Sequence, residues 1–217
     1  MDTIGLLSGQ NSGIASTLQG VQGSAKVITW ANTAVYSYAG RLALANIPVG
    51  SLTDVIVIQG NASMTLKIQS VILSAESNSA SPGIVPVSII RRTAANVGGT
   101  FTQIGGIPHD ISDLTPTAVV KVSTGTTVVT SNGPVFGAAM TPVGNGILGQ
   151  QFMVCANNGG VAPSATCWML EQLGIKPWIL RGVNDYIVIS LNTSAMPAGF
   201  QLDYEIDIEE DTSVIGG

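Results

Sequence analysis

Charge is scarce in this chain of 217 residues. Asp, Glu, Lys and Arg make up 10% of it, against about 25% in an average soluble domain. Aromatic residues make up 5%, cysteine occurs twice and histidine once. A soluble monomer normally carries more surface charge than this, which keeps it apart from its neighbours. The low charge therefore indicates a surface that is largely covered by other subunits.

The missing residues also argue against several classes of function. Only eight Lys and Arg are present and the net charge is −5, so the phosphate contacts of a nucleic-acid-binding protein are not expected. No apolar run reaches the roughly 18 residues of a membrane span. The first residues, with Asp2, lack the basic start of a secretory signal, which predicts that the product stays in the cytoplasm after synthesis.

Cysteine and histidine are too few for a zinc site of the usual kind, which takes four such ligands. Cys155 and Cys167 would allow a disulfide, but two free, buried thiols are expected in a reducing compartment. His109 and Asp110 have the residue types of a general base and its orienting carboxylate. Adjacent side chains rarely point the right way, however, and no serine is marked as a nucleophile. We expect a loop with an Asx-type turn here, and no catalytic residue.

One glycine-rich motif, Gly144–Gly149, matches the pattern of a dinucleotide-binding turn. That turn works between a strand and a helix, because the helix N-terminus meets the pyrophosphate. Here a loop precedes the motif and the strand-like run Gln151–Ala156 follows it. We therefore interpret the motif as a loop, and expect neither a cofactor nor a small-molecule substrate.

The rest of the chain has the pattern of strands joined by Gly-, Pro- and Asn-rich loops. Helical periodicity is nearly absent, and its best candidate is 165–174. The pattern predicts an all-β, jelly-roll-like two-sheet β-sandwich over 26–217, after an irregular N-terminal arm over 1–25. The expected strands are 26–30, 34–39, 54–60, 64–74, 84–92, 117–123, 126–130, 151–156, 177–181, 185–191 and 200–209.

Three local features are predicted within these strands. The alternation of Met64–Ser74 changes phase midway, which indicates a β-bulge. Pro86 lacks the N–H that a central strand uses, which places the first half of 84–92 at an edge or a strand start. The runs 117–123 and 126–130 flank a Thr-Gly step and predict a hairpin.

The segment Phe200–Asp211 holds six of the thirteen acidic residues. Apolar and polar residues alternate without a break from Phe200 to Glu209, the clearest strand pattern in the chain. Residues on one face of a strand lie about 6.6–7 Å apart, too far for two carboxylates to share a proton easily. A strand face also offers fewer oxygens than the roughly six to eight that calcium takes. We therefore expect no metal site and no catalytic role for Asp203, but a face that is solvated or meets a basic partner.

No charged residue lies between Lys121 and Glu171. This stretch holds too much Gly, Pro, Asn and Thr to span a membrane. Charge is depleted at the cores of protein interfaces, so we predict that the stretch is buried between subunits. Long loops that happen to lack charge are the alternative.

Two segments, Val87–Thr124 and Lys176–Asp211, resemble a group of tailed-bacteriophage virion proteins. The shared pattern is an Arg-Thr-Ala-Ala-Asn-x-Gly-Gly-Thr step, a His-Asp loop, an uncharged middle, a Leu-Arg-Gly turn and an acidic final strand. These motifs are typical of turns and loops and are not catalytic signatures. The matching residues are Arg92, Thr93, Ala94, Ala95, Asn96, Gly98, Gly99, Thr100, His109, Asp110, Leu180, Arg181 and Gly182.

The resemblance implies a non-enzymatic jelly-roll protein of the virion, similar to trimeric capsid decoration (cement) proteins, with the major capsid protein as its partner. Such a protein is made in the host cytoplasm and ends in the particle. A tail, baseplate or fibre protein is the first alternative. A carbohydrate-binding jelly-roll domain is the second, and it has little support because Trp30, Trp168 and Trp178 are spread along the sequence.

Overall fold

The computed structural model describes residues 33–43, 50–77, 83–124, 129–131, 146–155, 166–170, 174–193 and 199–211. The chain divides into two units, Met1–Thr33 and Ala34–Gly217, and from Ala34 on the strands belong to the second. The arm predicted over 1–25 and the strand predicted over 26–30 lie outside the described residues.

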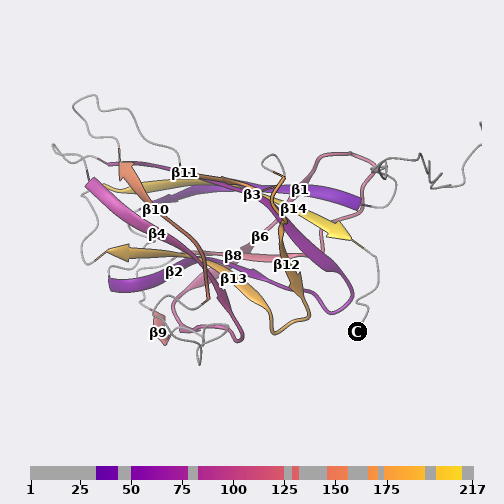
Figure 1. Cartoon of the computed structure of the whole chain (residues 1–217), viewed down its shortest axis with the longest axis horizontal. Coiled ribbons are helices and arrows are strands. Elements are labelled where there is room, and N and C mark those ends of the chain that lie inside the picture. Colours follow the sequence, from indigo (N-terminus) through magenta and orange to yellow (C-terminus); the bar gives the residue numbers. More distant parts are fainter. Residues whose placement is uncertain are drawn as a thin grey trace, which may run out of the picture. The chain divides into compact units, whose positions relative to one another are not determined.

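The described residues form strands and no helix, as the alternating sequence predicts (Figure 1). Most of the longer strands coincide with runs of β-branched and aromatic residues, which fit a pleated, half-buried surface. The strands are β1 (Thr33–Ala43), β2 (Gly50–Gln59), β3 (Thr65–Glu76), β4 (Gly83–Arg92), β5 (Val97–Gly98), β6 (Phe101–Ile104), β7 (Ile107–Pro108), β8 (Val119–Ser123), β9 (Val129–Ser131), β10 (Ile147–Cys155), β11 (Thr166–Met169), β12 (Trp178–Arg181), β13 (Tyr186–Thr193) and β14 (Gln201–Asp211).

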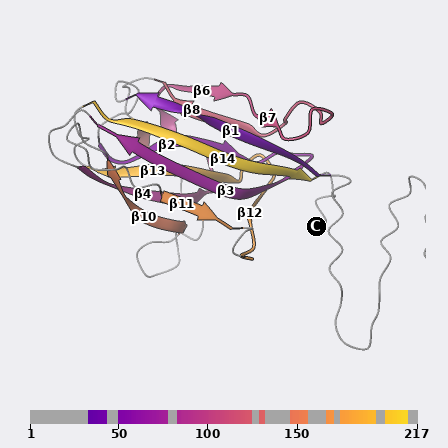
Figure 2. The same ribbon diagram turned by 90° about the horizontal axis from the view of Figure 1, so that it is seen from above.

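These strands form two antiparallel sheets and a small ribbon of β5 and β9. The first sheet, called the β14 sheet, has the order β11-β3-β14-β1-β7, and β12 also pairs with β3. The second, called the β13 sheet, has the order β10-β4-β13-β2-β8-β6. Figure 2 shows β10, β11 and β12 along one edge of the sandwich, and β6 and β7 along the opposite edge.

The strand order is that of a jelly roll. In chain order the eight principal strands are β1, β2, β3, β4, β10, the pair β11 and β12, β13 and β14. Counted in this way, the β14 sheet has the first, eighth, third and sixth principal strands side by side. The β13 sheet has the second, seventh, fourth and fifth side by side. This is the order of two interleaved Greek keys. The insertion between β4 and β10 adds β8 and β6 beyond β2, and β7 beyond β1. The predicted all-β, jelly-roll-like sandwich is confirmed.

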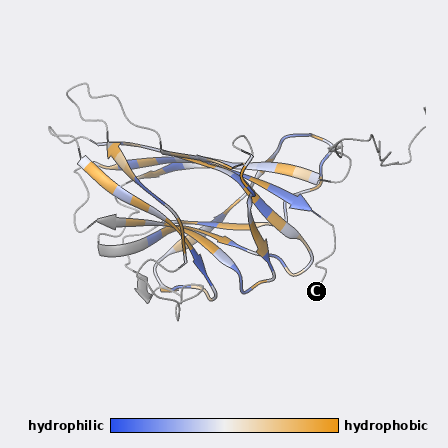
Figure 3. Cartoon of the chain, viewed as in Figure 1, coloured by the Kyte–Doolittle hydropathy of each residue, from blue (hydrophilic) through white to orange (hydrophobic). Residues whose placement is uncertain are grey.

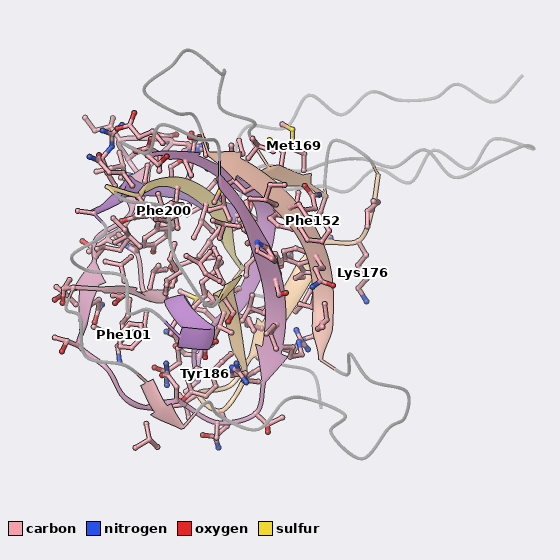
Figure 4. All side chains as sticks on the ribbon, turned by 90° about the vertical axis from the view of Figure 1, so that its left-hand side faces the viewer. Phe101, Phe152, Met169, Lys176, Tyr186 and Phe200 are labelled. Carbon is pink, nitrogen blue, oxygen red and sulfur yellow. The ribbon has the colours of Figure 1, made fainter. Side chains whose placement is uncertain are left out.

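The hydrophobic core lies between the two sheets. Along β14 the inward side chains of Leu202, Ile206 and Ile208 are fully buried, and the polar residues between them face outward. The same alternation is visible as hydrophobic and hydrophilic bands along the strands in Figure 3. Phe200, directly before β14, lies inside the sandwich in Figure 4. Burying each such side chain contributes about 1.5–3 kcal/mol.

The bulge predicted from the phase change in β3 is confirmed. Asp207 of β14 pairs with Ser70, and the next residue, Ile208, pairs with Ile68. Gln69 is therefore the extra residue, and its carbonyl accepts a hydrogen bond from the Leu170 N–H at 2.9 Å. Because a bulge shifts the strand by one residue, the inward set stays buried on both sides of it: Leu66, Ile68, Val71 and Leu73.

The placement of Pro86 near a strand start is also confirmed. Strand β13 pairs with β4 only from Val87 to Arg92. The residues of β4 before Val87, including Pro86, pair with β10 alone. The missing N–H of proline is tolerated there, because one side of this half-strand has no neighbour in the described part of the sheet.

Two sequence predictions are wrong. Strands β8 and β9 do not form the hairpin predicted from 117–123 and 126–130, since β8 lies between β2 and β6 while β9 pairs with β5. The helix candidate 165–174 contains strand β11, which pairs with β3 through Thr166–Met169. In both cases the pairing partner comes from a distant part of the chain, so tertiary contacts outweigh the local pattern.

The Gly182–Asn184 turn carries the chain from the β14 sheet to the β13 sheet, because β12 belongs to the first and β13 to the second. Gly182 has a φ of +79°, a conformation that glycine adopts without steric cost. The turn is bonded to the β2–β3 connection, where the Gly60 N–H donates to the Asp185 carbonyl at 2.8 Å and the Gly182 N–H donates to the Asn61 carbonyl at 2.9 Å. These bonds join the two sheets at this end.

Candidate functional site

The outward face of β14 is a row of carboxylates: Asp203, Glu205, Asp207, Glu209 and Asp211. The neighbouring strands β1 and β3 supply cations and hydroxyl groups to it. Sequence periodicity predicts the row itself. It does not predict the partners, because they lie far away in the sequence.

Arg41 of β1 binds one end of the row. Its Nε donates to Asp203 Oδ1 at 2.6 Å and its Nη2 donates to Asp203 Oδ2 at 3.1 Å, a two-pronged contact. Its Nη1 donates to Glu76 Oε1 at 2.9 Å. The hydrogen bond and charge of Asp203 raise the pKa of Arg41 further above its ordinary value. Because Arg41 is about half exposed, solvent screens these pairs and they contribute little stability.

Lys67 of β3 binds the other end of the row. Its Nζ donates to Glu209 and to Asp211, at 2.7 Å each. Burial lowers the pKa of Lys67, but the hydrogen bonds to the two carboxylates outweigh burial and raise it above its ordinary value. Glu209 also accepts a hydrogen bond from Gln69 at 2.6 Å. Glu205, in the middle of the row, is exposed, and no hydrogen bond or ion pair joins its carboxylate to the described residues.

The structure brings His109 beside a serine and an aspartate, though not in a catalytic arrangement. Ser37 Oγ lies 2.7 Å from His109 Nε2 and donates to Asp207 Oδ1 at 2.5 Å. In a Ser-His-Asp triad the carboxylate binds the imidazole nitrogen that faces away from the serine. Here Asp207 and Ser37 both lie on the Nε2 side. Since the Ser37 proton already points to Asp207, His109 Nε2 serves as the donor to Ser37.

Asp110 forms the expected Asx-type turn. Its Oδ1 accepts hydrogen bonds from the N–H and the hydroxyl of Ser112, at 2.9 and 2.7 Å. The backbone hydrogen bond from Ser112, followed by that from its hydroxyl, lowers the pKa of Asp110. Asp110 therefore shapes the loop and does not orient His109.

The Gly144–Gly149 motif also leads into a strand. Gly144 and Asn145 lie outside the described residues, and β10 begins directly after Gly146. The helix that a dinucleotide would need does not follow. Gly149 has a packing role, because a Cβ at this position would lie 2.4 Å from the indole nitrogen of Trp168.

Cys167 forms no disulfide and is exposed. The prediction of a free thiol is confirmed for this residue, and the prediction that it is buried is wrong. The cause is its place on β11, an edge strand on which the alternating neighbour Trp168 takes the inward position. The side chain of Cys155 lies outside the described residues.

Sequence reasoning missed two buried contacts made by charged residues. The first joins Arg92 to Asp54: Arg92 Nη2 donates to Asp54 Oδ1 at 2.9 Å, with both side chains almost fully buried. Burial raises the pKa of Asp54, and the hydrogen bond and charge of Arg92 offset part of that rise. No sequence signal links the pair.

The second missed contact is made by Glu210, at the end of β14. Its carboxylate accepts hydrogen bonds from the Thr117 N–H at 2.8 Å, the Ala118 N–H at 2.7 Å and the Thr117 hydroxyl at 2.8 Å. It therefore attaches the segment before β8 to the end of β14. A signal was present, because Glu210 follows Ile206 and Ile208 at a spacing of two and so falls on the inward face.

Large apolar side chains are exposed on the outward face of the β13 sheet, near its β10 edge. Phe152 of β10 is 68% exposed and Ile84 of β4 is 64% exposed. Phe152 pairs with Pro86, and Val154 pairs with Ile84. Phe152 and Ile84 are therefore diagonal neighbours on one face of the sheet, about 7–8 Å apart at the backbone. We call Ile84 and Phe152 the β10 patch. Strands β10 and β11 both belong to the uncharged stretch between Lys121 and Glu171.

The described residues contain no group of three or more His, Cys, Asp or Glu that could hold a metal ion. Within the same ranges, no helix is long and apolar enough to cross a membrane. Comparison of the chain with protein-family models, with curated proteins and with solved structures found no match.

Several of the residues that carry the resemblance to phage virion proteins have backbone roles here. Gly98, Gly99 and Gly182 have φ values of +78°, +76° and +79°, which L-residues with a side chain rarely adopt. His109 and Asp110 shape a loop beside β1, as described above. At these positions the motif residues therefore shape turns and loops of the backbone.

Proposed function

We propose that this protein is a structural component of a bacteriophage particle, most concretely a capsid decoration protein that associates with itself as a homotrimer and with the major capsid protein. The resemblance of Val87–Thr124 and Lys176–Asp211 to phage virion proteins supports this. The jelly-roll topology agrees with it, since viral capsid domains use that fold. Many other proteins share the fold, so topology alone does not carry the proposal.

The observation that carries the proposal is the β10 patch on an uncharged edge. Two large apolar side chains, Ile84 and Phe152, are more than half exposed on adjacent strands. Exposed apolar patches commonly mark protein–protein contacts, and charge is depleted where interface cores form. Figure 4 shows Phe152 on the outside of the sandwich, away from the buried Phe200.

Binding in this proposal depends on buried area and not on chemistry. A stable protein interface buries about 1,200–2,000 Å² in total, more than the β10 patch alone supplies. Other exposed residues of β10 and β11 would add to the buried area. A decoration protein that binds the assembled shell and not its dissociated subunits stabilises the shell by mass action.

The test replaces Phe152→Asp at the patch, with Val183→Asp as the matched control. Val183 is 48% exposed and lies in the β12–β13 turn, outside the β10 patch. Mass photometry measures self-association, and co-sedimentation with purified particles measures shell binding. Phe152→Asp should weaken one or both by at least about tenfold, because burying a phenylalanine contributes about 1.5–3 kcal/mol. Val183→Asp should behave as the wild type.

Equal association of the two variants would remove the β10 patch from the interface. Electron microscopy of the particle decides the location. Density on the head supports the decoration role, and density confined to the tail, baseplate or a fibre supports the alternative.

A further inference from the structure

Basic side chains gather at one place in this acidic protein. Three of the eight Lys and Arg residues line a single pocket of about 360 Å³ at the β12 edge of the sandwich. Pockets that bind small ligands begin at about 300 Å³. Figure 4 shows Lys176 on the outside of the sandwich. The lining residues are Arg91, Lys176, Pro177, Trp178, Ile179 and Arg181.

Arg91 forms a fixed wall between the two sheets. It comes from β4 of the β13 sheet, and its Nη2 donates a hydrogen bond to the carbonyl of Ile179 on β12 of the β14 sheet. Its Nε lies 3.7 Å from Asp185 Oδ1. Asp185 in turn accepts a hydrogen bond from the Arg181 backbone N–H at 3.1 Å. The guanidinium therefore holds the pocket in shape and is already partly neutralised.

Lys176 and Arg181 supply the positive charge that is available to a ligand. Both are exposed, and no hydrogen bond or ion pair joins either side chain to another described residue. Lys176 precedes β12 and Arg181 ends it, and both residues line the same pocket. An anion in the pocket would lie among these positive charges, and a charge-assisted hydrogen bond to either is roughly twice as strong as a neutral one.

Trp178 supplies an apolar wall. The residue is half-buried and packs against the core, so its orientation is held while part of its surface faces the pocket. An indole face binds flat apolar surfaces and the C–H groups of sugar rings. The sequence alone gives no sign of this arrangement, because Arg91 is far from Trp178 along the chain.

We propose that this pocket binds an acidic sugar, with the ring against Trp178 and the carboxylate or phosphate held by Lys176 and Arg181. A long polyanion such as nucleic acid fits less well, because the chain carries a net charge of −5 and polyanion binding needs an extended basic track. A sugar with a single anionic group matches this pocket better, because Lys176 and Arg181 can bind the anion while Trp178 contacts the ring. The inference is independent of the proposed role in a phage particle.

Isothermal titration calorimetry of the purified full chain tests the proposal with four probes. Glucuronate carries a carboxylate on a sugar ring, glucose 6-phosphate carries a phosphate on one, glucose lacks the charge and inorganic phosphate lacks the ring. We expect glucuronate, glucose 6-phosphate or both to bind at least about tenfold more tightly than glucose and inorganic phosphate, because each of the latter lacks one half of the interaction. Whichever acidic sugar binds more tightly identifies the anionic group.

Three variants locate the binding. Lys176→Gln and Arg181→Gln should each weaken it about tenfold or more, the loss expected for one charge-assisted hydrogen bond. Lys121→Gln removes the same charge on β8, away from the pocket, and should bind as the wild type does. The ligand should also shift the indole N–H resonance of Trp178, which Trp178→Phe assigns among the three tryptophans.

Four results would overturn the proposal. They are no binding of either acidic sugar at millimolar concentration, equal binding of glucose, equal binding of inorganic phosphate, or equal weakening by Lys121→Gln. Because Lys176 and Arg181 are exposed, their glutamine variants should fold normally, which circular dichroism checks. The outcome does not depend on whether the protein binds a capsid.

Discussion

Glu210 and Glu205 lie on the same strand, carry the same chemical group and should respond very differently to substitution. Glu210 is 4% exposed and its carboxylate accepts hydrogen bonds from Thr117 and Ala118. Glu205 is exposed and its carboxylate has no partner among the described residues. The perturbation we consider is Glu210→Ala, with Glu205→Ala as its control.

The loss of stability in Glu210→Ala follows from the hydrogen-bond donors that would lose their acceptor. Two backbone N–H groups, of Thr117 and Ala118, lose a charged acceptor, while the Thr117 hydroxyl is free to turn elsewhere. A hydrogen bond to a charged group contributes about 1.5–3 kcal/mol, and water that enters the vacated space recovers part of the loss. We therefore expect the free energy of unfolding to fall by about 3 kcal/mol, which lowers Tm by about 6–12 °C in a domain of this size. Glu210→Gln, which keeps one acceptor oxygen, should cost about 1 kcal/mol.

Urea denaturation at a single protein concentration measures these changes, since self-association shifts the apparent stability. Hydrogen exchange at the amide of Ala118 reports the local effect, and it should become faster in Glu210→Ala alone. Glu205→Ala should leave the denaturation midpoint unchanged. The reasoning is refuted if Glu210→Ala and Glu205→Ala unfold at the same midpoint, because the buried carboxylate would then hold nothing.

Two further predictions concern buried contacts. The folded-state pKa of Asp54 lies above its ordinary value of 3.8. The folded protein therefore binds the proton of the Asp54 carboxyl group more tightly than the unfolded chain does. The stability that this proton contributes is lost as pH rises above 3.8 and the folded-state carboxyl group ionises. The unfolding free energy of the wild type minus that of Asp54→Asn should therefore decrease with rising pH in that window, as urea midpoints measure; an increase would mean that Arg92 outweighs burial. Gly60→Ala should lower Tm, because its Cβ would lie 2.4 Å from the Gly182 carbonyl oxygen and overpacking costs about 1–3 kcal/mol. Gly105→Ala, with nothing within 4 Å of its Cβ, is the control, and equal melting temperatures for the two variants would contradict the close contact.

The candidate surfaces were predictable to different degrees. The acidic row on β14 and the bulge at Gln69 follow from a period of two, which a strand imposes on its own residues. The inward position of Glu210 follows from the same period. The β10 patch was partly predictable, because the uncharged stretch marks the segment but not the face on which Phe152 lies. The pocket was not predictable, since Arg91 and Trp178 come from different sheets.

By itself, the sequence determined the fold class and most of the strands, because alternation, turn glycines and the placement of proline are local consequences of backbone geometry. Only the tertiary structure decided which strands are neighbours. It placed β8 beside β2 and β6 and made a strand of Thr166–Met169, since pairing is selected by burial between distant segments. It also determined the partners of each charged group, such as Arg92 with Asp54, because two side chains interact only once the chain has brought them together.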